Sequence, residues 1–203
     1  MNIIKRGYTL AEVLITLAVI GTIATVTLPS LQTNAQRAQV VPVLQKAMNT
    51  LRNANQKILL ENDARTLKSV CGKNYHTCLM DVTAGSSIIN KYTTNNVMLT
   101  NNVALADNIV LSFHSTLQPH DGETDNHYQV RIDINGKKGP NRMAKDIFEF
   151  WIHSLTGEIT ASGNNGRWNS GSNNHCRNGE VPTILNYCTA AIIENGWQIK
   201  YKY

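Results

Sequence analysis

Apolar residues dominate the chain from residue 8 to residue 28, where Glu12 is the one acidic or basic residue. At about 1.5 Å per residue, a helix of this length spans roughly 31 Å, close to the ~30 Å hydrocarbon core of a bilayer. Lys5 and Arg6 precede the stretch, and the next charge is Arg37. This asymmetry predicts a single-pass membrane helix over residues 8–30, with its N-terminus in the cytoplasm and the rest of the chain outside.

After Pro29 the pattern becomes that of an amphipathic helix, which we expect over residues 31–62. Apolar side chains recur at spacings of three and four, the period of one helix face. They are Val40, Leu44, Ala47, Leu51, Ala54 and Ile58. This stripe predicts that the second half of the helix packs on the sheet of a globular domain over residues 63–203.

The region beyond residue 108 has the pattern of short strands. Runs rich in β-branched and aromatic residues occur at 109–113, 128–134, 147–153 and 158–161, between Gly, Asn, Asp and Pro breaks. Residues 63–108 suggest loops with a short helix or strand, and 163–179 a loop. A short helix from Pro182 to about Glu194 and an alternating strand over 197–203 follow. The expected fold class is α+β, with a long helix on one face of an antiparallel sheet.

The four cysteines all follow the apolar stretch. An even number outside the cytoplasm indicates two disulfides, for which three pairings exist. We favour Cys71–Cys78 with Cys176–Cys188, because each pair closes a short loop. Zinc binding is the alternative, although the sequence has no C-x-x-C.

Charge and motifs give little indication of further chemistry. The formal net charge of +5 and the pI of about 9.1 suggest nucleic-acid binding as a possible function. Lys and Arg form no dense run, however, so we favour a general surface charge. The sequence has no nucleophile elbow, Walker A or zinc-protease motif, so we predict no enzymatic activity.

Two polar clusters are candidate metal ligands. Oxygens of Asp133, Asn135 and Asp146 around a Gly turn suit calcium, yet neighbouring lysines oppose a cation and a structural turn is favoured. The second cluster consists of His114, His120, Asp121, Glu123, Asp125 and His127. We interpret it as a solvated hairpin loop, so no cofactor is expected and calcium stays the alternative.

Glu12 has a local explanation in its own helix. Thr9 and Glu12 are spaced as a capping box, and an acid in the first turn suits the positive end of the helix dipole. This arrangement explains how the helix tolerates the carboxylate, but it assigns Glu12 no further role.

The leader and helix together resemble a known family. A basic leader ending in Gly7, followed by Tyr8-Thr9-Leu10-Ala11-Glu12 and an apolar run, resembles the N-terminus of type IV pilins and type II secretion pseudopilins. The resemblance implies that a prepilin peptidase removes residues 1–7 and N-methylates Tyr8, where Phe is more usual. Gly21 and Pro29 lie where many pilins carry Gly and Pro, which implies a helix segment that can stretch.

The resemblance also implies a role for Glu12 in assembly. With Thr9 beside it, the carboxylate would pair with the Tyr8 amino group of a neighbouring subunit and fix the axial register. The chain would then be a structural subunit that polymerises with itself or other pilins. An inner-membrane platform driven by a cytoplasmic ATPase would move it from the bilayer into a surface or periplasmic filament.

Several alternatives stay open. The cysteines, of which Cys176 and Cys188 resemble the C-terminal loop of many pilins, and the lack of an evident calcium loop favour a pilus over a pseudopilus. A secretory signal cut near residues 33–35 or a plain anchor would involve no cut after Gly7. The plain anchor would suit a monomeric extracytoplasmic binding protein, which predicts no polymer.

Overall fold

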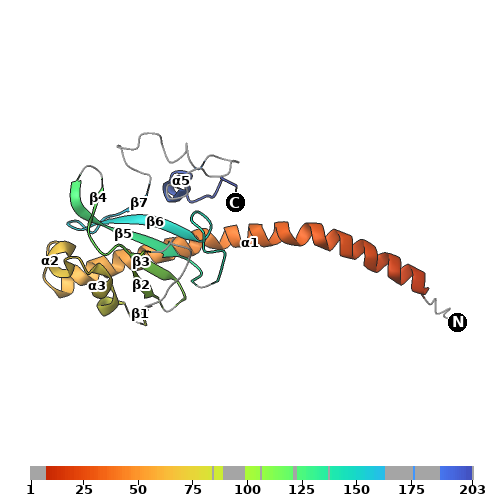
Figure 1. Cartoon of the computed structure of the whole chain (residues 1–203), viewed down its shortest axis with the longest axis horizontal. Coiled ribbons are helices and arrows are strands. Elements are labelled where there is room, and N and C mark those ends of the chain that lie inside the picture. The colour runs from red at the N-terminus through yellow and green to blue at the C-terminus, as the bar shows by residue number, and fades with distance from the viewer. Residues whose placement is uncertain are drawn as a thin grey trace, which may run out of the picture. The chain divides into compact units, whose positions relative to one another are not determined.

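The computed structural model describes residues 8–83, 85–88, 99–105, 107–120, 123–136, 138–162, 176 and 188–202. The chain divides into two compact units, Met1–Gln39 and Val40–Tyr203. Helix α1, Leu10–Glu61, belongs to both units (Figure 1). Its backbone is helical through Pro29 and Pro42, although a proline removes one helical hydrogen bond at each position. The predicted continuous helix is therefore confirmed.

The second unit contains an antiparallel sheet with the order β1-β2-β3-β5-β6-β7, while β4 pairs with β5. The strands are β1 Ser87–Ile88, β2 Asn101–Ala104, β3 Val110–Phe113, β4 Gln118–His120, β5 Glu123–Asp133, β6 Ile147–His153 and β7 Ile159–Ala161. The runs predicted at 109–113, 128–134, 147–153 and 158–161 correspond to β3, β5, β6 and β7. The α+β class is thus confirmed.

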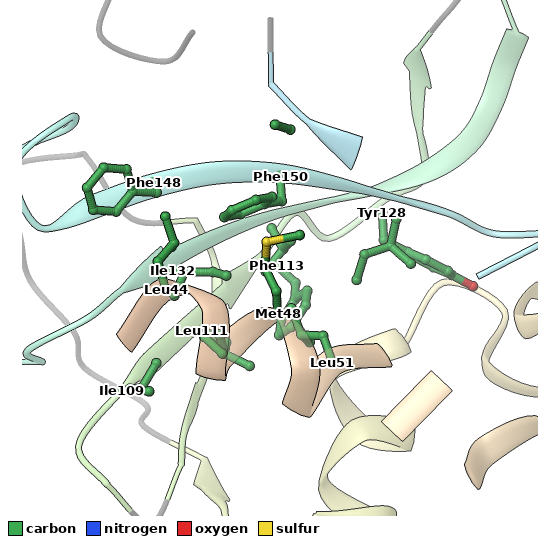
Figure 2. Close-up of a cluster of buried hydrophobic side chains, with 14 of the residues drawn as sticks. Leu44, Met48, Leu51, Ile109, Leu111, Phe113, Tyr128, Ile132, Phe148 and Phe150 are labelled. Carbon is green, nitrogen blue, oxygen red and sulfur yellow. The ribbon is translucent and has the colours of Figure 1, made fainter. Parts of the chain in front are cut away.

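The C-terminal half of α1 packs on this sheet. Every member of the predicted apolar stripe from Val40 to Ile58 is buried. Figure 2 shows Leu44, Met48 and Leu51 of α1 facing side chains of β3, β5 and β6. Full burial of a side chain of this size stabilises a fold by about 1.5–3 kcal/mol, so this stripe holds the helix to the sheet.

Two short helices fill the region where the sequence predicted loops with one helix or strand. Helix α2, Leu67–Cys71, begins where the Thr66 hydroxyl accepts a hydrogen bond from the Ser69 amide. Helix α3, Tyr75–Val82, brings Tyr75 into the core, where its ring stacks on Tyr128 with 4.8 Å between centroids. Helices this short carry little periodic signal, because their stability comes from caps and packing.

Both favoured disulfides are present. Cys71–Cys78 links α2 to α3, with 5.8 Å between the Cα atoms. Cys176–Cys188 reaches the first residue of α5, Cys188–Glu194, with 5.3 Å between the Cα atoms. The cysteines are therefore bonded to one another and are not zinc ligands in this structure.

The C-terminal tail corrects one prediction. Residues 197–202 belong to no strand, although Trp197, Ile199 and Tyr201 are more buried than the residues between them. The tail is held by side chains, since the Tyr201 hydroxyl donates to the Ala144 carbonyl at 2.8 Å. Helix α5 ends at Glu194 as predicted, whereas its expected start at Pro182 and most of the loop 163–179 lie outside the described residues.

Candidate functional site: the apolar N-terminal helix

The predicted capping box is present at the start of α1. The Thr9 amide and hydroxyl both donate to Glu12 Oε2, at 2.8 and 2.9 Å, and the Glu12 amide donates to Thr9 Oγ1 at 3.3 Å. These bonds satisfy backbone donors that the first helical turn leaves open. They also fix the carboxylate beside Tyr8, whose side chain is 88% exposed.

The apolar side chains that follow are covered by no other part of the described chain. Leu10–Thr27 is long and apolar enough to cross a membrane, and none of it is buried within the fold. The large exposed side chains are Leu10, Val13, Leu14, Ile15, Leu17, Val19, Ile20, Ile23 and Val26. A soluble monomer rarely exposes so large an apolar surface, and a helix of this kind could be a membrane anchor or a signal sequence.

Threonine hydroxyls within the span bond to the helix itself. Thr16 donates to the Val13 carbonyl at 2.9 Å, and Thr22 to the Val19 carbonyl at 2.8 Å. Thr25 and Thr27 make the same kind of bond, one turn back along the helix. A hydroxyl that is bonded in this way costs less in an apolar phase, since it needs no water. These bonds were not among the sequence predictions, although the spacing of Thr along an apolar helix is a signal for them.

Other expected assembly residues are only partly placed. Gly7 lies outside the described residues, so the structure leaves the cut site a prediction. A Cβ added at Gly21 would meet nothing within 4 Å, so the fold itself does not require glycine there. Pro29 lies within the helical backbone. The proposed stretching of this segment stays a prediction.

The turn that holds the calcium candidates is tied together by its own hydrogen bonds. Asp146 Oδ1 and Oδ2 accept from the amides of Arg142 and Asn141 at 2.6 and 2.7 Å. Asp133 Oδ1 accepts from the Asn135 amide at 3.1 Å, and both aspartates are buried. The structural turn is therefore present.

The histidine cluster is not the loop that the sequence suggested. Residues 123–127 belong to β5, so the predicted hairpin loop there is wrong. His127 is buried and lies edge-on to His153 of β6, with 4.7 Å between ring centroids. Sequence pattern missed this pair because its two residues are far apart along the chain. In the described residues, no group of three acidic, histidine or cysteine side chains is placed to hold a metal.

A buried ion pair joins the outer face of the sheet to α5. Arg131 Nε donates to Glu149 Oε2 at 2.8 Å, and Ser162 donates to Oε1 of the same carboxylate at 3.0 Å. The Glu149 amide donates to the Thr189 hydroxyl of α5 at 3.1 Å. With its charge and lone pairs satisfied, this cluster anchors the disulfide-linked helix rather than offering a reactive group.

The chain matches no protein-family model, and searches of curated proteins and of solved structures found no match.

Proposed function

We propose that this chain is the precursor of a filament subunit of the type IV pilin class. It would be cut after Gly7, N-methylated on Tyr8 and polymerised through the apolar part of α1. The observation that carries the proposal is an apolar helix, Leu10–Thr27, that has no cover within the fold and begins with a capped carboxylate at Glu12. The leader that ends in Gly7 supplies the resemblance to prepilins.

The apolar helix suits transfer between two apolar surroundings. In the bilayer its side chains contact lipid, and in a filament they would contact the same helix of other subunits. Because apolar area stays covered in both places, the transfer has little hydrophobic driving force. Assembly would therefore depend on an inner-membrane platform and a cytoplasmic ATPase, the partners that the resemblance implies.

Glu12 would serve both its own helix and a neighbouring subunit. Both bonds from Thr9 go to Oε2, so an amino group that approaches Oε1 need not disturb the cap. An ion pair between Glu12 and the Tyr8 amino group of a second copy would be strengthened by the low dielectric of a filament core. It would give a fixed register to helices whose apolar surfaces alone could slide.

N-terminal mass spectrometry of sheared surface fibres tests the processing. The proposal expects the protein in the fibres, with N-methyl-Tyr8 as its first residue. A chain that begins at Met1 and is absent from the fibres would instead support a monomeric, membrane-anchored binding protein. A terminus near residue 36 would indicate a secretory signal peptide.

The role of Glu12 is tested with Glu12→Gln, and Glu61→Gln serves as a matched control at the other end of α1. Glu61 is exposed and forms a 3.6 Å pair with Lys57 on the same helix. We expect both variants to reach the membrane in normal amount and only Glu12→Gln to lose fibres. Normal fibre yield from Glu12→Gln would remove the register role. Fibres that appear at the surface without any secretion substrate would favour a pilus over a pseudopilus.

A further inference from the structure

The fold gathers basic residues that are scattered in the sequence. The connection between β5 and β6 carries Lys138, Arg142 and Lys145, of which the first two are exposed. The bonds from the Asn141 and Arg142 amides to Asp146 hold residues 141–146 of this connection in a turn. Arg142 and Lys145 therefore lie on a hydrogen-bonded backbone.

The C-terminal tail brings two more cations to the same place. Tyr201 is buried, and its hydroxyl donates to the Ala144 carbonyl within the β5–β6 connection at 2.8 Å. Lys200 and Lys202, on either side of Tyr201, are exposed. We name this set of five residues, Lys138, Arg142, Lys145, Lys200 and Lys202, the cationic end.

The acidic residues near the cationic end are already engaged. Asp133 and Asp146 are buried and accept hydrogen bonds from backbone amides. Asp107, in the turn between β2 and β3, forms a 2.6 Å ion pair with Lys46 of α1. Glu194 and Lys145 each have an interaction of their own. Asp133, Asp146 and Glu194 carry three negative charges against the five positive charges of the cationic end, so an excess of positive charge remains among the residues that the structure describes.

The cationic end lies where the chain enters the second unit. Figure 2 shows Leu44 of α1 near Ile132 and Phe148, which pair with each other next to the β5–β6 connection, while Leu51 lies toward Tyr128. The connection is thus at the Val40 end of the packed half of α1. Twelve residues, 28–39, separate Val40 from the apolar span Leu10–Thr27, so this tether keeps the Val40 end of the second unit within reach of the membrane surface.

We propose that the cationic end binds the anionic phosphate headgroups of the membrane that α1 crosses, and so holds the globular unit against the surface before assembly. The inference rests on the membrane anchoring in the proposed function. Each Lys or Arg near an anionic surface strengthens attachment about fivefold. The tether through α1 keeps the local lipid concentration high, so weak individual contacts suffice.

Lysine acetylation followed by mass spectrometry tests this contact on the full chain in lipid nanodiscs. Discs of purely zwitterionic lipid are compared with discs that also contain phosphatidylglycerol. We expect Lys138, Lys145, Lys200 and Lys202 to react more slowly only in the anionic discs. The controls are Lys57, Lys68 and Lys73, at the opposite end of the unit, which should react equally in both. Protection should disappear near 1 M salt, where the Debye length falls to about 3 Å.

A triple variant, Lys138→Gln with Lys200→Gln and Lys202→Gln, tests the contact independently of those lysines. The docked population should fall about 100-fold, so the remaining reporter, Lys145, should react equally in the two kinds of disc. The matched variant with Lys57, Lys68 and Lys73 changed to Gln should keep the protection. Formation of both disulfides checks that each variant folds.

The outcomes separate the proposals. Equal acetylation of the cationic end in both discs, with the protein co-eluting with the discs, would overturn headgroup binding and leave anchoring intact. Failure to co-elute would overturn the anchoring itself. Protection by duplex DNA but not by anionic lipid would identify a nucleic-acid surface and also overturn the proposal.

Discussion

Among the polar residues on the packed half of α1, we expect substitution of Asn55 to lower the free energy of unfolding most. It is buried, it accepts a hydrogen bond from the Tyr75 hydroxyl of α3, and its amide donates to the Gly157 carbonyl at 2.9 Å. Tyr75 is also buried, and this burial raises the pKa of its hydroxyl above the ordinary value. One side chain thus joins α1 to α3 and to the turn between β6 and β7.

The expected effects follow from which groups lose partners. Asn55→Leu leaves the Tyr75 hydroxyl without this acceptor, at about 1–3 kcal/mol, and removes a further bond worth about 1 kcal/mol. Tyr75→Phe leaves the Asn55 carbonyl oxygen without its donor, at about 1–3 kcal/mol. In the double variant neither group remains. Its loss of stability should therefore be about 2 kcal/mol smaller than the sum of the single losses.

Urea unfolding of the oxidised full chain in mild detergent, followed by tryptophan fluorescence, measures these free energies. Asn53→Leu is the matched control, since Asn53 is an exposed asparagine on the same helix and should change stability by less than about 0.5 kcal/mol. The slope with denaturant should stay constant across the set. Additivity of the two single variants within about 0.5 kcal/mol would show that the Asn55–Tyr75 bond contributes nothing.

Three local features predict further outcomes. Gly136 has φ +63°, and a Cβ added there would lie 2.6 Å from the Asn108 carbonyl oxygen. Gly136→Ala should therefore lower the free energy of unfolding, measured in urea, by more than about 1–2 kcal/mol. Gly139→Ala is the control, because a Cβ at Gly139 would meet nothing within 4 Å and should cost less. Burial raises the pKa of Tyr128 to about 12, against about 10 when unfolded, so stability should be full below pH 10 and fall as pH rises toward 12. The part of the tyrosinate absorbance that Tyr128→Phe removes should appear together with the change in circular dichroism, and its appearance near pH 10 in a fully folded chain would contradict this. Thr9→Val removes the cap but keeps the carboxylate of Glu12, whereas Glu12→Gln keeps a cap but removes the charge. Thr9→Val should therefore give more fibres than Glu12→Gln. The reverse order of fibre yields would show that the cap, and not the charge, is decisive.

The elements with a strong period were predictable from the sequence. The stripe from Val40 to Ile58 repeats over five turns, and a pattern of that length specifies both the helix and its buried face. The capping box at Thr9 and Glu12 was predictable for a different reason, since both partners lie within one turn. The two disulfides could be predicted because, of the three possible pairings, the favoured one closes two short loops.

Contacts between distant residues were not predictable in the same way. Asn55 and Gly157 are 102 positions apart, and nothing in the local pattern around either residue indicates the bond. His127 lies in a run of polar residues that suggests a solvated loop, yet pairing with β6 buries it against His153. The tail from Trp197 alternates like a strand because one side is buried, but within the described part of the chain its backbone pairs with no strand. Tertiary packing decides these cases, and a single sequence carries no direct record of it.

The two parts of α1 follow different rules, and the difference bears on the proposed function. From Val40 onward the apolar side chains of the helix are buried against the sheet, and the polar Asn55 is hydrogen-bonded inside the core. From Leu10 to Thr27 its apolar side chains contact nothing else in the described chain, while threonine hydroxyls bond to the helix itself. A helix that served only the globular fold would need no second part of this kind. The requirement for an outside apolar partner is met equally by lipid and by other copies of the helix, and the one feature that distinguishes them is the carboxylate of Glu12. Lipid tails offer that group no counter-charge, whereas in the proposed filament the new amino terminus at Tyr8 of a neighbouring subunit would.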